Sequence, residues 1–177
     1  FIYTYTGTPY TSIMDQNPPE GTYTTDMRVT GFISLNAPLA PDGFVHIEHA
    51  DPRLLDFSFS DGRFEYNKAN VDAARAVFEL ATDASGGIKD WSLAVQRVAP
   101  APGIEELRVS THFAGCRAVN FSCDMGSLFG DVNPTIDQAE SFIPGTWTVP
   151  IVPEPSAYAL MLAGLGLVNF AARRRWS

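Results

Sequence analysis

The chain has 177 residues, of which 45% are hydrophobic, enough for one domain with a substantial core. Its formal net charge is −8, and the arginines at positions 173–175 contribute +3, so the rest of the chain carries −11. A body this acidic repels phosphate backbones and the sequence has no basic stripe, which excludes nucleic acid as a partner.

Short runs of β-branched and aromatic residues recur along the body, with polar and apolar residues alternating in most of them. This period of two predicts strands. The alternation in the run 27–35 shifts phase at Phe32 and Ile33, which predicts a bulge at Gly31. The runs lie at residues 1–6, 27–35, 55–59, 63–66, 77–80, 91–95 and 107–110.

Turn residues separate these runs. Pro41-Asp42-Gly43 and Ser60-Asp61-Gly62 predict tight turns, and the stretch 83–87 predicts a hairpin between strands at 77–82 and 88–97. Many short strands with regular turns predict an all-β fold, an antiparallel β-sandwich or jelly roll over residues 1–149. The less regular stretch 115–145 is expected to be a long surface excursion.

The aromatic residues of the body typically fill a sandwich core when they lie on strands. The alternative is a face that stacks on sugars, as in a carbohydrate-binding module. A second alternative is a glycoside hydrolase, but no spacing among the glutamates singles out a catalytic pair. No nucleophile elbow, phosphate loop or dinucleotide fingerprint is present, so we expect a protein that is not an enzyme. The aromatics concerned are Tyr3, Tyr5, Tyr10, Tyr23, Trp91 and Trp147.

A His-x-Glu-His motif places His46 and Glu48 on one face of a strand and His49 on the opposite face. This spacing favours a solvated strand end over a metal site, because both histidines of a zinc helix share one face. We expect no metal and no cofactor. The one weak alternative is calcium, since oxygen-bearing residues alternate from 131 to 137 without the turn glycine and final glutamate of a calcium loop. Its candidate ligands are Asp131, Asn133 and Asp137.

Cys116 and Cys123 are the two cysteines of the chain. In an oxidising compartment we expect them to form a disulfide, and closing this short loop contributes about 2.5 kcal/mol in the chain-entropy model. The alternatives are metal ligation and a reactive thiol, and the lack of a nearby histidine disfavours a zinc site.

The C-terminal tail, residues 150–177, combines three signals. Prolines at 150, 153 and 155 predict an extended strap, because each restricts its predecessor to extended geometry. The uncharged run Ser156–Ala172 would reach about 25 Å as a helix, which is near the length of a membrane span. The arginines that follow predict a cytoplasmic end, with the body outside. The alternative is a buried C-terminal helix of a soluble domain.

Together these three parts resemble the PEP-CTERM sorting signal. The resemblance implies that an exosortase, an integral-membrane enzyme with a cysteine nucleophile, processes the tail. It also implies a precursor anchored in the inner membrane of a Gram-negative bacterium, facing the periplasm, and then delivered to the cell surface or extracellular matrix. The residues that carry the resemblance are Val152, Pro153, Glu154, Pro155, Arg173, Arg174 and Arg175.

The body also resembles a recurrent ectodomain of PEP-CTERM proteins, which implies an extracellular β-domain without an established activity. We therefore expect a structural or interaction component of an exopolysaccharide matrix, with exopolysaccharide as a candidate partner. Because export requires a leader and the chain starts at Phe1, a removed signal peptide is expected. The matching segments include Tyr5–Tyr10, Val29–Phe32, Ala37–Pro41, Phe57–Gly62, Thr82–Ile88 with Trp91, and Pro144–Trp147.

Overall fold

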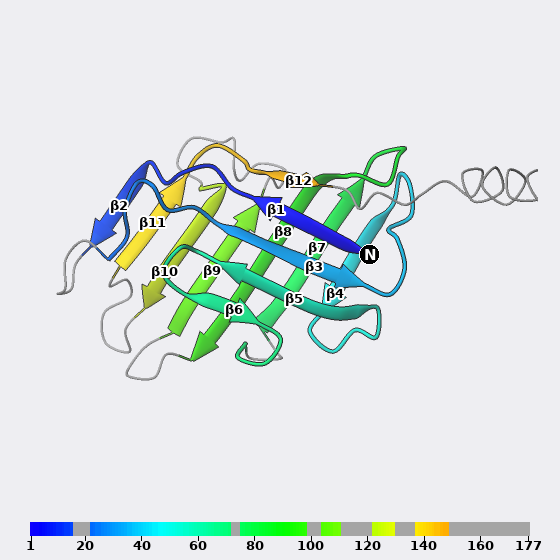
Figure 1. Ribbon diagram of the computed structural model, residues 1–177, viewed down its shortest axis with the longest axis horizontal. Helices are drawn as coiled ribbons and strands as arrows, with labels where there is room; N and C mark the ends of the chain where they lie inside the picture. Colours follow the sequence, from blue (N-terminus) through cyan, green and yellow to red (C-terminus); the bar gives the residue numbers. More distant parts are fainter. Residues whose placement is uncertain (16–21, 72–74, 99–103, 111–121, 130–136, 149–177) are drawn as a thin grey trace, which may run out of the picture.

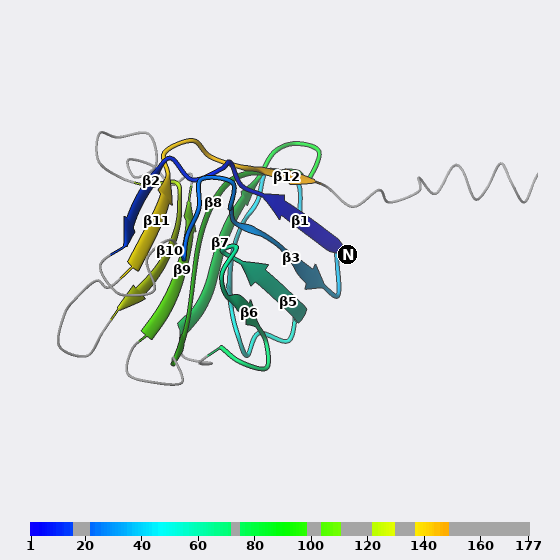
Figure 2. The same ribbon diagram turned by 60° about the vertical axis from the view of Figure 1, so that its left-hand side comes forward.

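A computed structural model describes residues 1–15, 22–71, 75–98, 104–110, 122–129 and 137–148. These residues form two antiparallel sheets, so the predicted all-β class is confirmed. The two sheets lie face to face, and their strands cross at a wide angle (Figures 1 and 2). The strands are β1 (Ile2–Thr6), β2 (Ser12–Asp15), β3 (Thr30–Leu35), β4 (Phe44–Glu48), β5 (Leu54–Ser60), β6 (Glu65–Asn67), β7 (Ala76–Thr82), β8 (Ile88–Val98), β9 (Ile104–Ser110), β10 (Asp124–Phe129), β11 (Asp137–Ser141) and β12 (Thr146–Thr148).

The smaller sheet has five strands in the order β12-β1-β3-β5-β6. It therefore places the first strand of the chain beside the last one described. Alternation decides which side chains it buries: along β1, Tyr3 and Tyr5 point inward, whereas Ile2, Thr4 and Thr6 are exposed. Its β-branched and aromatic residues suit a pleated surface that is buried on one face.

The larger sheet has seven strands in the order β2-β11-β10-β9-β8-β7-β4. Strands β7 to β11 follow one another as a meander, and the predicted hairpin at 83–87 is confirmed between β7 and β8. The Asp83 carboxylate accepts hydrogen bonds from the backbone N–H groups of Ser85 and Gly87, and Gly86 adopts a φ of 81° that suits glycine. The jelly-roll connectivity stays a prediction.

The core lies between the sheets and is built largely from rings. Phe57 of the small sheet packs edge-on against Phe78 of the large sheet, with ring centroids 5.1 Å apart. Tyr5 contacts Trp91 and Trp147 with centroid distances of 5.7 and 5.1 Å. The prediction that these aromatic residues fill the core is therefore confirmed. The alternative, in which they form a row that stacks on sugars, is wrong. Five of the six are buried, and Trp147 is half-buried against the core: Tyr3, Tyr5, Tyr10, Tyr23, Trp91 and Trp147.

The bulge predicted at Gly31 is wrong. Gly31 pairs in regular register with Tyr5 on one side and Phe59 on the other, and the register shift in β3 falls at Ser34 and Leu35. Inward positions continue through Ile33 and Leu35, so no phase change occurs. The apparent shift arose from Phe32, an aromatic residue that the strand holds on its outer face.

The surface excursion predicted for residues 115–145 is also wrong where the structure describes it. Strands β10 and β11 pair with each other inside the seven-stranded sheet. Their inward positions carry Asp124, Gly126 and Ser141, which are all buried. Because these residues are polar or lack a side chain, the alternation that marks a strand is invisible in the sequence.

We expect Gly31→Ala to destabilise the protein by about 2 kcal/mol, as overpacking a core commonly does. A Cβ at this position would overlap the Phe59 ring and the backbone carbonyl of Ser58. The backbone carbonyl belongs to the paired strand and has little freedom to move. Chemical denaturation measures the effect. Ser34→Ala, an outward position on the same strand, is the control and should change stability by under about 0.5 kcal/mol; equal effects of the two substitutions would contradict the packing argument.

Candidate functional site

Strand β12, the last described element before the tail in the sequence, lies at the edge of the small sheet. Strand β12 pairs with β1, with Thr148 opposite Thr4, and the Thr148 hydroxyl donates a hydrogen bond to the Thr4 carbonyl at 3.2 Å. The described residues end at Thr148, and three residues separate it from Val152. The strap, the predicted span 156–172 and the arginines 173–175 lie outside the described residues. Within the described ranges, no helix is long and apolar enough to cross a membrane.

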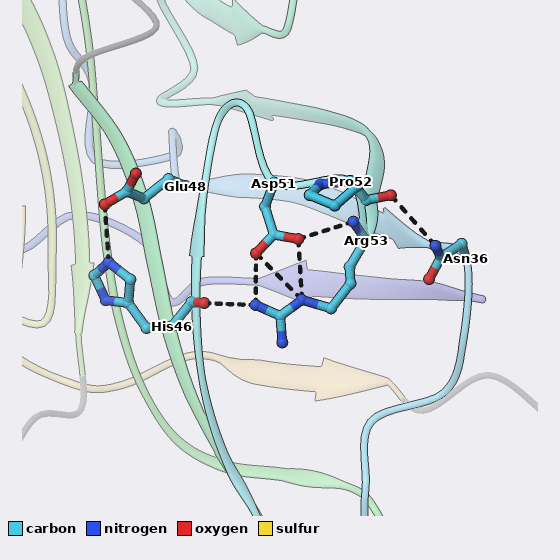
Figure 3. Close-up of polar contacts among 6 residues, drawn as sticks. All are labelled: Asn36, His46, Glu48, Asp51, Pro52 and Arg53. Atoms are coloured by element: carbon cyan, nitrogen blue, oxygen red, sulfur yellow. Dashed lines mark hydrogen bonds and ion pairs between the residues drawn. The ribbon is translucent and has the colours of Figure 1, made fainter.

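The turn between β4 and β5 carries a network of exposed polar contacts, which Figure 3 shows. The Arg53 guanidinium donates to both carboxylate oxygens of Asp51, with Nε at 3.0 Å from Oδ1. These hydrogen bonds hold the pKa of Asp51 at about 2. Arg53 Nη2 also donates to the His46 carbonyl at 2.9 Å. This bond occupies a carbonyl of β4, the edge strand of the large sheet, and so blocks pairing with another chain there.

His46 lies on the outer face between two carboxylates. Its Nε2 is 3.4 Å from Glu48 Oε1 and its Nδ1 is 3.4 Å from Glu79 Oε1. His49 points the other way and donates from Nε2 to the Lys68 carbonyl at 2.9 Å. The predicted division of this motif between two faces is therefore confirmed. No group of three ligating side chains able to hold a metal occurs in the part of the chain that the structure describes.

An apolar pocket of about 250 Å³ adjoins this turn, between the 36–43 loop and strand β4. Leu39, Val45 and the exposed ring of Phe44 contribute apolar surface, and Arg53 with Asn36 contributes polar atoms. Asp51 and the His46 carbonyl already engage the guanidinium, and Asn36 Nδ2 donates to the Pro52 carbonyl at 3.3 Å (Figure 3). These polar groups serve the turn and leave little for a ligand.

A second polar cluster lies inside the sandwich and was not found from the sequence. Asp61 accepts hydrogen bonds from the Tyr23 and Tyr66 hydroxyls, at 2.8 and 3.2 Å, and from two backbone N–H groups of its own turn. Asp124 accepts one from the Tyr5 hydroxyl at 2.6 Å. Both carboxyls are fully buried. The Asp124–Tyr5 bond connects the large sheet to the small sheet, whereas Asp61 ties its own turn to Tyr23 and to Tyr66 of β6. The Ser-Asp-Gly turn signal gave no sign of this role.

Burial raises the pKa of the Asp124 carboxyl to about 7, although the hydrogen bond from Tyr5 opposes the shift. The hydroxyl pKa values of Tyr5, Tyr10 and Tyr23 are raised as well, first by burial and then by the nearby carboxylates. These hydroxyls remain protonated donors. The described hydrogen bonds of this cluster run between its acids and tyrosine hydroxyls of the core, and the Asp124–Tyr5 bond links the two sheets.

The remaining predicted site residues are only partly described. Asp137 begins β11, is buried, and forms an ion pair with Arg63 at 2.7 Å, so one of its oxygens already has a cationic partner. Asp131 and Asn133 lie outside the described residues, and the calcium alternative stays a prediction. Cys123 is buried beside β10, whereas Cys116 is not described, so the disulfide also stays a prediction.

Comparison with known proteins decides the nature of the tail. The family model described as the PEP-CTERM protein-sorting motif matches residues 152–175. The chain carries a PEP-CTERM sorting motif. The match spans the strap, the apolar run and the arginines on which the sequence resemblance rests. No curated protein and no solved structure matches the chain.

The PEP-CTERM motif implies processing by exosortase. It indicates a membrane-anchored precursor that is processed for export in a Gram-negative bacterium. The motif begins within a few residues of the last paired strand, so the sandwich and the sorting signal are adjacent along the chain. The boundary at residues 149 and 150 stays a prediction.

Proposed function

We propose that the tail delivers this sandwich to the cell surface or extracellular matrix, where it acts as a non-enzymatic structural or interaction component of an exopolysaccharide matrix. The observation that carries the proposal is the sorting motif at residues 152–175. The fold supports it, because the buried carboxyls Asp61 and Asp124 bind tyrosine hydroxyls of the protein's own core. The Asp124–Tyr5 bond contributes to cohesion between the sheets, and the Asp61 bonds stabilise the small sheet and its adjoining loop.

Replacing Pro153, Glu154 and Pro155 together by alanine should abolish processing. The strap loses two residues with fixed φ and its acidic side chain, and a processing enzyme binds its substrate in an extended form. We expect the variant to accumulate uncleaved in the membrane fraction of a host with an exosortase, as measured by immunoblotting of membrane, medium and matrix fractions.

The matched control removes prolines elsewhere. Pro38→Ala with Pro41→Ala changes the 36–43 loop and leaves the tail intact, so this variant should be processed normally. Normal release of the strap variant would contradict the sorting role. A wild-type chain released to the medium but absent from the matrix fraction would contradict the proposed destination, and release of reducing sugars from the matrix polysaccharide by the purified chain would contradict its non-enzymatic nature.

A further inference from the structure

The outer face of the five-stranded sheet carries hydroxyl side chains in ordered rows. Strand register places one row across all five strands and a second row beside it. Every member is exposed or half-buried, in contrast to the aromatic inner face. The first row is Thr148, Thr4, Phe32, Ser58 and Asn67, and the second is Thr146, Thr6, Thr30, Ser60 and Glu65.

Phe32 is the only aromatic residue in these two rows. It lines an open groove of about 480 Å³ that runs over strands β3, β5 and β6. Exposing part of an aromatic ring to water on an outer sheet face costs free energy. The core does not require Phe32, because the inward positions of β3 are filled by other residues, including Ile33 and Leu35. The other groove residues with polar side chains are Asp56, Ser58, Glu65, Asn67 and Lys68.

The groove is held in shape by its own hydrogen bonds. The Ser58 hydroxyl donates to Glu65 at 3.0 Å, across the β5–β6 pair. Lys68 Nζ donates to the Leu54 carbonyl at 2.6 Å, which fixes the turn after β6 against β5. The Asn67 side-chain oxygen accepts from the backbone of Ala69 and Asn70. A ligand would thus meet a wall that is already ordered, which reduces the entropy cost of binding.

The chemistry of this groove fits a neutral glycan. An aromatic ring presents a partially negative face, which attracts the polarised C–H bonds of a sugar ring. The carboxylates of Asp56 and Glu65 accept hydrogen bonds from sugar hydroxyls, and bonds to a charged acceptor are the stronger kind. Because Lys68 already binds main-chain carbonyls, these carboxylates and the −11 charge outside the tail arginines disfavour an anionic polymer.

We propose that this face is a binding surface for a neutral polysaccharide, with a sugar ring stacked on Phe32 and its hydroxyls bound by the groove walls. The proposal rests on the proposed matrix function and names the surface that would perform it. This surface differs from the sugar-stacking face suggested by the sequence. The aromatic residues of that face pack in the core, and Phe32 was not one of them. In this proposal one sugar ring stacks on Phe32 in the groove, and the hydroxyl rows contact the neighbouring sugars of the polymer.

Affinity electrophoresis of the full chain in a non-ionic detergent tests the proposal, with dextran or a soluble β-1,3-glucan in the gel. We expect retardation by at least one of these neutral glucans and none by alginate, which is anionic. Phe32→Ala should weaken the apparent affinity at least tenfold, whereas Phe32→Tyr should retain it. Phe44→Ala removes an exposed ring from the other sheet and is the matched control, which should bind like the wild type.

Thermal unfolding of each variant shows whether the fold is preserved. Three results would overturn the proposal: no retardation by either neutral glucan, stronger retardation by alginate, or equal losses for Phe32→Ala and Phe44→Ala. A concentration-dependent dimer that Phe32→Ala disrupts would assign the face to a second copy and also overturn it. The matrix function is tested separately by fractionation: a chain that reaches the matrix without binding these glucans would refute the glycan surface alone.

Discussion

Replacing Asp124 by asparagine should abolish most of the loss of stability that the wild-type protein undergoes as the pH rises from about 4 to about 7. Burial between the sheets raises the pKa of this carboxyl from 3.8 to about 7, against the opposing hydrogen bond from Tyr5. The unfolded chain releases the proton above about pH 4, whereas the folded chain keeps it until about pH 7. The folded state is therefore favoured in acid, and a difference of about three pKa units corresponds to about 4 kcal/mol.

Chemical denaturation of both proteins at pH 5 and pH 8 measures this effect. Asparagine keeps an acceptor for the Tyr5 hydroxyl and cannot ionise. The free energy of unfolding of the variant should therefore increase relative to that of the wild type as the pH rises. Asp83→Asn is the control: hydrogen bonds from Ser85 and Gly87 lower the pKa of Asp83, so its contribution to stability is lost only below about pH 4, and the pH dependence of this variant should match that of the wild type between pH 5 and pH 8. Parallel pH profiles for the wild type and Asp124→Asn would show that the carboxyl ionises freely within the fold.

An Arg63→Met variant should lose about 3 kcal/mol of stability. The Arg63 side chain is 20% exposed and pairs at 2.7 Å with Asp137, whose side chain is only 3% exposed. The guanidinium also lies over the Phe64 ring, 4.6 Å from its centroid. Removing the cation leaves a buried carboxylate without its counter-charge, which is the costly way to break such a pair.

The double variant Arg63→Met with Asp137→Leu separates the cost of an orphaned charge from the value of the pair. Replacing both partners by apolar residues leaves no buried charge, so most of the lost stability should return. Urea denaturation of the wild type, the single variant and the double variant gives the three free energies. A double variant as unstable as Arg63→Met would mean that packing around Arg63, including its ring contacts, dominates.

The parts of the fold that could be predicted from the sequence are those in which burial and hydrophobicity coincide. Strand β7 alternates buried and half-buried positions along its whole length, and its hairpin with β8 was found for that reason. Strands β10 and β11 were missed because their buried positions include Asp124, Asp137 and Ser141. The two carboxyls have a tyrosine and an arginine partner that are distant in the chain, and no local pattern encodes such a pairing.

The candidate surfaces divide in the same way. The sorting motif is a linear signal, so its residues could be named from order and spacing alone. The groove at Phe32 could not be predicted from the sequence, because only strand register brings β3, β5 and β6 together. In the sequence, the outward position of the Phe32 ring resembles a phase shift of the strand. Side-chain hydrophobicity indicated that Phe32 should be buried, and only the pairing of its neighbours showed which face it occupies.

The pairing of β1 with β12 determines when the sandwich can close. The Gly145 N–H donates to the Tyr5 hydroxyl at 3.0 Å, a contact between residues 140 positions apart. The meander β7–β11 joins neighbours in the chain, whereas β1 lacks one partner until residue 148 has been exported. The sorting motif follows only a few residues later. The strand that completes the small sheet is therefore separated from the sorting motif by residues 149–151 alone, and a chain cut short of the motif by even a few more residues would lose this strand.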